Sequence, residues 1–250
     1  MAGGIETGAV YTGLLDFGVE LDLEKLVGWT GASVSTTWLW TSGEDASEGL
    51  VGNFLTISNI AAFQTLRVMD LWFQQTLWDG QVSLRLGQLR ADSEFVISDY
   101  AALFLNGTFG WPAFMYLNLP SGGPAYPMGT LGARLMVQPV DWFTFQTAIF
   151  QGNVYDQNVN RHGFRWRLDG ENGFFFLSEA QVRWNHADAE LGLPGQGKLG
   201  IWAQTGELAD VLAESTQPGL IAVTVIPASR NSLAMVRVSM FRAALLAEYG

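Results

Sequence analysis

The sequence predicts an all-β fold, an antiparallel β-barrel whose strands cross a membrane. Three observations predict it. Apolar and polar residues alternate with a period of two in one segment after another, which is the pattern of strands with two unlike faces. The links between these segments run alternately short and long, and aromatic residues gather near the segment ends. Transmembrane barrels combine short turns at one rim, long loops at the other and aromatic girdles at both.

The first strand is expected over residues 15–24, LDFGVELDLE. Its odd positions are all apolar, and its even positions are acidic or glycine. The alternation by itself leaves two orientations open. In a soluble sandwich the leucines would pack a core and the acids would face water. In a membrane barrel the leucines would face lipid and the acids would line a pore.

Seven more segments alternate in the same way, so about eight clear strands are expected. Several reach the roughly 9–11 residues of a tilted transmembrane strand, whereas strands of globular sheets are usually shorter. An Asp-Gly pair at residues 79–80 marks a tight hairpin between two of them. The seven segments are residues 33–40, 65–77, 82–89, 131–138, 142–150, 174–184 and 198–206.

The links decide between the two orientations. Three of them, residues 41–64, 90–130 and 151–173, are longer than a compact soluble domain usually contains. The links between them are short or of medium length, so the long ones all fall at one rim. This arrangement favours the barrel, and it predicts two aromatic belts formed by Trp29, Trp38, Trp40, Trp78, Trp142 and Trp184. The side chains then expected to face lipid are Leu15, Phe17, Val19, Leu21 and Leu23, with Asp16, Glu20 and Asp22 facing the pore.

The composition excludes several classes of protein. Hydrophobic residues make up 48% of the chain and charged residues only 15%. The net charge of −11 argues against a nucleic-acid-binding surface, and the absence of cysteine excludes disulfides and cysteine-based metal sites. The sequence contains no run of 18 apolar residues, so it predicts no transmembrane helix. The first residues lack the pattern of a signal peptide.

Four strings carry a resemblance to a known family: LDLEKLVGW, RLGQLRADSEFVISDYAALFLNGTFGWPA, NLPSGGPAYP and KLGIW. They resemble the OprB-type carbohydrate-selective porins, and the likeness covers roughly residues 8–206. The resemblance implies an outer-membrane barrel of sixteen strands that passes glucose and related sugars by diffusion. It implies no enzymatic activity, no cofactor and no metal. It also implies that the link 90–130 folds inward and narrows the lumen.

Two features depart from the family pattern. The first clear strand leads into a short turn, so we expect an upstream strand and a signal peptide to be missing from this truncated member. Residues 207–250 do not continue the alternating hairpins, although residues 220–226 read as an apolar strand. We therefore expect residues 1–250 to form one partial barrel domain, and a frameshift is one hypothesis for the tail.

A porin needs a wet lumen lined with groups that exchange hydrogen bonds with its solutes. The candidates are the polar residues at alternate positions of the strands. Arginine suits the neighbouring hydroxyls of a sugar because its planar guanidinium group offers several hydrogen-bond donors. For Trp202 two interpretations stay open, stacking on a sugar ring and packing of a loop against the wall. The expected pore-lining residues are Asp70, Arg85, Arg134, Glu179, Arg183 and Trp202.

The link 90–130 is too rich in aromatic residues to be a solvated linker, so it should pack on something. We expect Asp92, Glu94, Asp99 and Tyr100 to belong to a constriction in which the acids face the wall arginines. The alternative is that Asp92 or Ser93 caps a short helix and that Asp99 is solvated. A basic segment, RHGFRWRL at residues 161–168, is interpreted as a loop face or a lipopolysaccharide contact.

The resulting hypothesis is a porin in the bacterial outer membrane that passes mono- or small oligosaccharides. Its other expected partners are outer-membrane lipid and lipopolysaccharide, and nucleic acid is not among them. A general porin without sugar preference and a soluble all-β sugar-binding module are the alternatives. The sequence does not specify the sugar or the oligomeric state.

Overall fold

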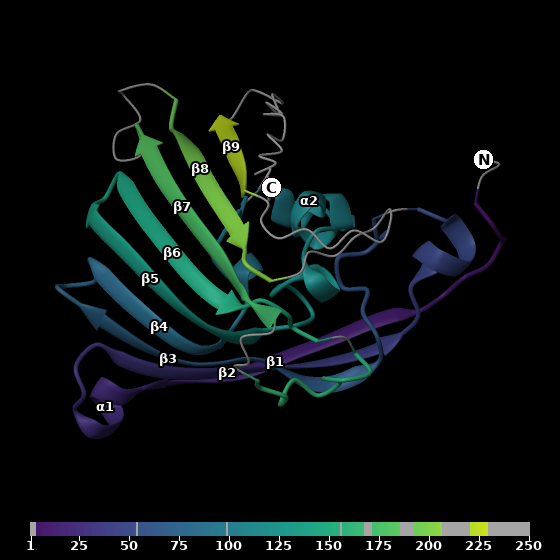
Figure 1. Ribbon diagram of the computed structural model, residues 1–250, viewed down its shortest axis with the longest axis horizontal. Helices are drawn as coiled ribbons and strands as arrows, with labels where there is room; N and C mark the ends of the chain where they lie inside the picture. The colour runs from purple at the N-terminus through teal and green to yellow at the C-terminus, as the bar shows by residue number, and fades with distance from the viewer. Residues whose placement is uncertain are drawn as a thin grey trace, which may run out of the picture.

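The computed structural model describes residues 4–53, 55–98, 100–155, 157–167, 172–185, 193–206 and 221–229. They form one curved antiparallel sheet of nine strands, in which each strand pairs with its neighbours in the sequence (Figure 1). The all-β antiparallel prediction is confirmed. Within the described residues β1 and β9 are the two edges, so the sheet is open along one side.

The eight expected strands are all present, and three of them match residue for residue. A ninth strand falls in the tail, where the sequence predicts an apolar strand. The strands are β1 (Thr12–Asp22), β2 (Ala32–Gly43), β3 (Thr65–Leu77), β4 (Val82–Leu89), β5 (Thr130–Val140), β6 (Phe143–Gln151), β7 (Phe174–Trp184), β8 (Gly195–Gln204) and β9 (Ile221–Ser229).

The first strand ends earlier than expected because Asp22 caps a helix. Its carboxylate accepts hydrogen bonds from the backbone N–H groups of Glu24 and Lys25, at 3.0 and 3.2 Å. This N-cap starts α1 (Leu23–Val27), and Gly28 ends it in the left-handed conformation. The expectation that Leu23 is a lipid-facing strand residue is therefore wrong, since Leu23 is the first residue of α1.

The other helices are single turns within the long links. None of the helices in the described part of the chain is long and apolar enough to cross a membrane. The turns are η1 (Ser47–Val51), η2 (Ala91–Ser93), η3 (Ala101–Leu103), η4 (Gly107–Phe109), α2 (Ala113–Tyr116) and η5 (Pro120–Gly122).

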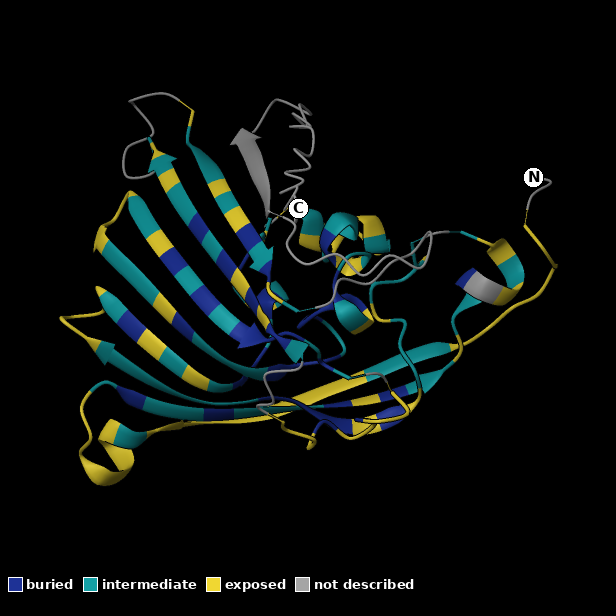
Figure 2. Cartoon of the chain, in the orientation of Figure 1, coloured by how far each residue is buried: buried dark blue, intermediate teal, exposed yellow. Residues whose placement is uncertain are grey.

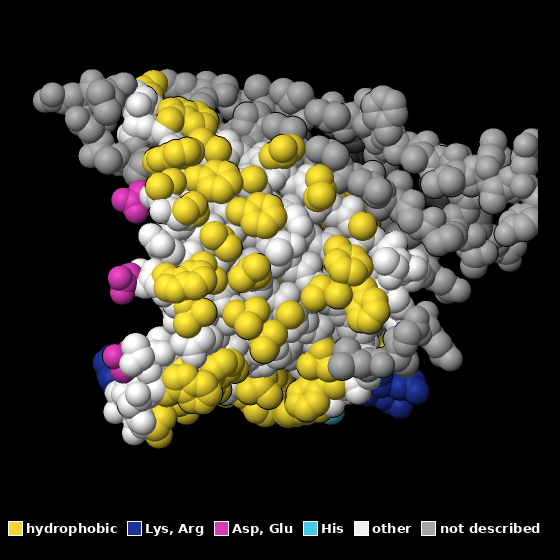
Figure 3. All heavy atoms as spheres, turned by 60° about the vertical axis from the view of Figure 1, so that its left-hand side comes forward, with side chains coloured by type: hydrophobic (Ala, Val, Ile, Leu, Met, Phe, Trp, Pro, Cys, Tyr) yellow, Lys and Arg dark blue, Asp and Glu magenta, His cyan; other side chains and the backbone are white. Residues whose placement is uncertain are grey.

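The convex outer face of the sheet is apolar. Exposed and less exposed residues alternate as bands along the strands, and the outer surface is covered with hydrophobic side chains (Figures 2 and 3). The register carries this phase across the sheet, as Phe17 lies opposite Trp38 and Leu84 opposite Leu135. Exposed apolar residues of this face include Leu15, Phe17, Val19, Leu21, Leu84, Leu86, Leu135, Phe145, Phe176, Val182, Leu199 and Ile201.

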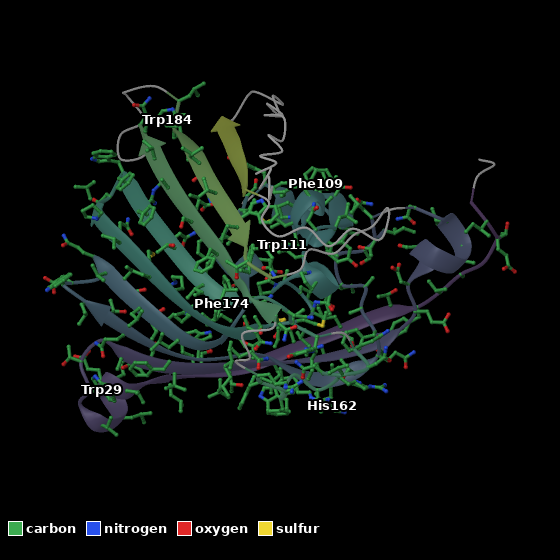
Figure 4. All side chains as sticks on the ribbon, viewed as in Figure 1. Trp29, Phe109, Trp111, His162, Phe174 and Trp184 are labelled. Carbon is green, nitrogen blue, oxygen red and sulfur yellow. The ribbon has the colours of Figure 1, made fainter. Side chains whose placement is uncertain are left out.

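Aromatic residues lie at both rims. Trp29, Trp78, Trp142 and Trp184 are exposed at the rim of the short links, where Figure 4 labels two of them. Trp40 is exposed near the opposite end of β2, at the rim of the long links. This is the arrangement expected of side chains with an apolar body and a polar tip at two membrane interfaces.

The strand β3 changes phase along its length. The register between β2 and β3 shifts between Thr37 and Trp38, as a β-bulge produces. Simple alternation places Arg67 in the same phase as Phe73, but the shift puts Arg67 opposite Leu39, on the inner face. Both residues are buried there. A strict period of two along β3 is therefore wrong at its first residues.

The hydrophobic core lies inside the curve of the sheet, between the wall and the link that follows β4. Phe95, Met115 and Leu119 of that link pack with Phe175 and Trp202 of the wall. The short helices of the link occupy the concave side in Figure 1. The link is thus a packed layer, and its seat on the wall is the site described next.

Candidate functional site

The first contact between the link and the wall is an ion pair shared by two arginines. Arg85 of β4 and Arg134 of β5 lie opposite each other, and both pair with the carboxylate of Glu94. Alternation puts both arginines on the inner face, because their strand neighbours Leu84 and Leu135 point outward. Glu94 therefore joins the link to two adjacent strands.

The two guanidinium groups are held in place by wall residues. Arg85 Nε and Nη2 donate to Gln74 Oε1 at 3.0 and 2.8 Å, and Arg134 Nη2 donates to the same oxygen at 3.2 Å. The guanidinium carbon of Arg85 also lies 3.8 Å from the ring centroid of Trp72, a cation–π contact. Arg134 further donates to the hydroxyl of Ser83. These contacts hold both cations in place in addition to their pairing with Glu94.

A second contact ties the two ends of the link together. Arg90 Nε donates to Asp70 Oδ2 of β3 at 3.0 Å, and its Nη1 lies 3.7 Å from Asp92 Oδ1. Asp92 Oδ2 accepts a hydrogen bond from the backbone N–H of Tyr126 at 2.8 Å. Burial raises the pKa of the Asp92 carboxyl, and it raises the pKa of the Tyr126 hydroxyl to about 12.

A third contact clamps the backbone of the link at Val96. Glu179 Oε2 of β7 accepts from the Val96 N–H at 2.8 Å, and Gln146 Nε2 of β6 donates to the Glu94 carbonyl at 2.6 Å. Lys198 Nζ of β8 lies 3.4 Å from Glu179 Oε1. Val96 has φ +59°, a left-handed conformation that is costly for a β-branched residue. The side chains of three strands thus hold a strained turn.

Trp202 lies on the inner face as expected, but the link covers it. Only 2% of Trp202 is exposed, and its ring packs against Phe175 with the centroids 6.2 Å apart. A cavity of about 10 Å³ beside it, lined in part by Val96 and Met115, has room for about one water molecule. Of the two interpretations of Trp202, packing of the loop against the wall is the one that the structure supports.

A much larger hollow is lined by the link. Its volume is about 1090 Å³, and it lies between the β2–β3 link and the β4–β5 link. Amide, hydroxyl and aromatic side chains line it, with Tyr116 and Phe109 among the exposed rings. Figure 4 shows Phe109 and Trp111 on this side of the sheet. We call this hollow the vestibule.

The sequence matches the family described as carbohydrate-selective porins, OprB family, over residues 6–239. The chain belongs to this family. It is similar to Porin B of Pseudomonas aeruginosa, with 25% identity over 217 residues that cover 80% of this chain and 44% of that protein. It is also similar to a solved structure, "High pH structure of Pseudomonas putida OprB", with a TM-score of 0.66, 23% identity, and coverage of 83% of this chain and 49% of that one.

The family and the fold agree. The solved structure shows the same fold over most of this porin chain, and the family resemblance predicted from the four sequence strings is confirmed. Membership of a porin family also supports the expectation that the chain is not an enzyme. The porin chain spans about half the length of the relatives that it matches.

The predicted site residues of this porin chain fall into three groups and some outliers. Arg85, Arg134 and Glu94 meet, as do Asp70 and Asp92 through Arg90, while Glu179 binds the link separately. Arg183 of β7 lies closer to the short-link rim, and Tyr100 is an exposed residue of the link. Asp99 lies outside the described residues.

One part of the constriction prediction is wrong. Glu94 and Asp92 were expected to face the wall arginines across an opening, but each is in direct contact with an arginine. Glu94 therefore fastens the link to the wall, whereas Asp92 contacts Arg90 within the link. The reason is the turn η2 (Ala91–Ser93), which closely follows β4 and keeps the chain from extending away from the wall before Glu94.

The vestibule residues Tyr116 and Trp111 were not among the predicted site residues. Both belong to the aromatic stretch GTFGWPAFMY, which the sequence marks as packed, but packed and exposed rings look alike in a sequence. Trp111 is fixed by its Nε1–H, which donates to the Gly122 carbonyl at 3.1 Å. Tyr116 is exposed within the vestibule.

Proposed function

We propose that the chain forms part of the wall and the constriction of an outer-membrane porin through which sugars diffuse. The observation that carries the proposal is the seat of the link on the inner face. It places fixed arginine, glutamine and carboxylate groups beside a vestibule lined by aromatic and amide side chains. The apolar outer face of the sheet suits contact with lipid, and this favours a membrane location over a soluble sugar-binding module.

The charge balance of the seat suits a neutral solute. The group around Glu94 has two cations and one anion, and the group around Arg90 has one cation and two anions. Lys198 and Glu179 cancel each other. The three groups together carry no net charge, so they offer hydrogen-bond donors and acceptors without a strong preference for either sign of ion.

In this proposal the vestibule binds the sugar selectively, and the link anchored at Glu94 narrows the lumen. A pyranose has an apolar face and a rim of hydroxyls, so it stacks on an aromatic ring while its hydroxyls bind amides and carboxylates. Tyr116 and Phe109 present exposed rings, and Asn59 and Gln64 present amides in the same hollow. The sugar then passes the link near Glu94 and Arg85, which are 17% and 18% exposed.

The test is permeation through the reconstituted protein. In liposomes, glucose should swell the vesicles faster than a zwitterion of equal size, and sugar should reduce single-channel current in a saturable way. Tyr116→Ala should weaken the sugar block, whereas Tyr100→Ala, which removes an exposed ring of the same link outside the vestibule lining, should not. Equal swelling rates with no sugar block would indicate a general porin instead.

A further inference from the structure

The link between β6 and β7 starts at the vestibule, where Gln157 is part of the lining, but its later residues leave the inner side. Residues 161–167 cross to the outer side of β3 and β4, and we call them the outer strap. Figure 4 shows His162 beneath the sheet, on the side away from α2. The Val68 N–H donates to the His162 carbonyl at 3.1 Å, and Thr65 Oγ1 donates to the Arg161 carbonyl at 2.8 Å. The strap thus binds the part of β3 that extends beyond its pairing with β4.

Aromatic contacts hold the outer strap on the outer face. Trp166 Nε1–H donates to Gln88 Oε1 at 2.6 Å, and Gln88 shares the phase of the outward residues of β4. Phe164 meets the outward residue Trp38 in an edge-to-face arrangement with the ring centroids 5.7 Å apart. The rings of Phe164 and Trp166 remain exposed at the rim of the long links. This is the position of an interfacial aromatic belt.

The outer strap also concentrates positive charge at that rim. Arg161, Arg165 and Arg167 are all exposed, and Figure 3 shows basic side chains at one edge of the apolar face. Arg161 Nη2 donates to the Gln64 carbonyl at 2.9 Å, and Arg165 Nη1 to the Val159 carbonyl at 3.3 Å. Each of these two bonds uses one of the five N–H groups of a guanidinium, which leaves donors at the surface.

This distribution differs from that of the rest of the described chain. The arginines at positions 67, 85, 90 and 134 belong to the inner side, and the exposed Lys25 lies at the opposite rim. The whole chain carries a net charge of −11, so a general attraction to anions is not expected. A local cluster of arginines beside exposed aromatic rings, at the edge of an apolar wall, suits an anionic partner there.

We propose that the outer strap binds the phosphate groups of a phosphorylated lipid headgroup, in the leaflet at the long-link rim. Arginine forks match phosphate oxygens in two-point hydrogen bonds, and the rings of Phe164 and Trp166 sit among the first atoms of the acyl chains. The proposal rests on the membrane location given under the proposed function. It goes beyond sugar passage, because the strap lies outside the lumen.

The experiment measures lipid retained by the detergent-solubilised protein. Native mass spectrometry would compare the parent with Arg161→Gln/Arg165→Gln, using lipid A that carries two phosphates and the same lipid after its phosphates are removed. Each arginine near an anionic lipid surface contributes enough to change affinity about fivefold, so the double variant should bind about 25-fold more weakly. Lys25→Gln, which removes an exposed cation at the other rim, should bind like the parent.

Two further arms keep the proposal falsifiable. Trp166→Phe keeps a ring but loses the bond to Gln88, so it should reduce retention of the phosphorylated lipid without changing the β-sheet circular dichroism signal. Inorganic phosphate should compete only weakly, because it lacks the acyl chains. Equal retention of both lipids by the parent, or equal retention by parent and double variant, would overturn the proposal. Sugar-dependent swelling is measured in parallel, so a failure of the strap and a failure of sugar passage are separate results.

Discussion

Removing the negative charge of Glu94 should release the link from the wall. Glu94→Gln keeps the size of the side chain but leaves Arg85 and Arg134 without their shared anion. Breaking a buried pair from one side costs about 3–5 kcal/mol. Both arginines keep Gln74 as a partner, and Glu94 is 17% exposed, so we expect the lower end, about 3 kcal/mol.

A loss of about 3 kcal/mol changes the ratio of seated to released link by roughly 150-fold, at 1.36 kcal/mol for each factor of ten. Hydrogen exchange in detergent reports this ratio through the amide of Val96, whose N–H donates to Glu179 of the wall. The same variant should show a larger single-channel conductance, because a released link narrows the lumen less.

The control is Asp141→Asn, which removes an exposed carboxylate from the short turn between β5 and β6, at the rim away from the link. It should leave both the exchange rates of the link and the conductance unchanged. If the Val96 amide exchanged as slowly in Glu94→Gln as in the parent, the ion pairs would not hold the link. Hydrophobic packing around Phe95 would then have to account for the position of the link.

Three further outcomes are expected. Trp202→Ala should lower the free energy of unfolding in detergent by about 3–5 kcal/mol, since the ring is buried, whereas Trp184→Ala at the exposed rim should cost far less. Glu179→Ala should make the peptide bonds around Val96 accessible to protease, because its N–H and the Lys198 ammonium lose their partner; protection equal to the parent's would contradict this. Burial raises the pKa of the Asp92 carboxyl, so this group favours the seated link below about pH 4 and less as the pH rises through the raised value. Asp92→Asn should remove that pH dependence of proteolysis in residues 90–98, and an unchanged profile would assign it to another group.

The strands could be read from the sequence because their two faces meet unlike surroundings. Where one face is apolar outside and the other is polar inside, the residues alternate with a period of two, as in β4 and β7. The bulge opposite Thr37 could not be read in this way, since the extra residue is defined only by the pairing of two strands. Its consequence, a buried Arg67, follows from the register and leaves no local signal.

The end of β1 was predictable in principle. Asp22 continues the apolar–acidic alternation, but the same residue begins a short helix that Gly28 ends, and these two residue types mark helix boundaries. The strand pattern and the cap pattern overlap over two residues, and the hydrogen bonds to Asp22 decide between them. Sequence alternation alone extends the strand too far.

The composition of the candidate site was predictable, but its pairing was not. Carboxylates in the link and arginines on the wall were expected to belong together, and Glu94 with Arg85 and Arg134 shows this. Which acid meets which arginine depends on how far the link travels after β4, and that distance is a property of the fold. The exposure of Tyr116 and the burial of Trp202 depend on the same path.

The order of the anchoring residues along the chain limits how the protein assembles. The link follows β4, and three of the groups that hold it, Arg134, Gln146 and Glu179, belong to strands that come later in the chain. Each strand pairs with its sequence neighbour, so hairpins can be added one after another. Its contacts with Arg85 and Asp70 are available as soon as β3 and β4 have formed, but the link can be fully seated only when β7 is in place. If the link moved to the convex side before β7 was added, Glu94 would be trapped on the outer face of the sheet. Glu94 could then reach Arg85 and Arg134 only after the later strands separated.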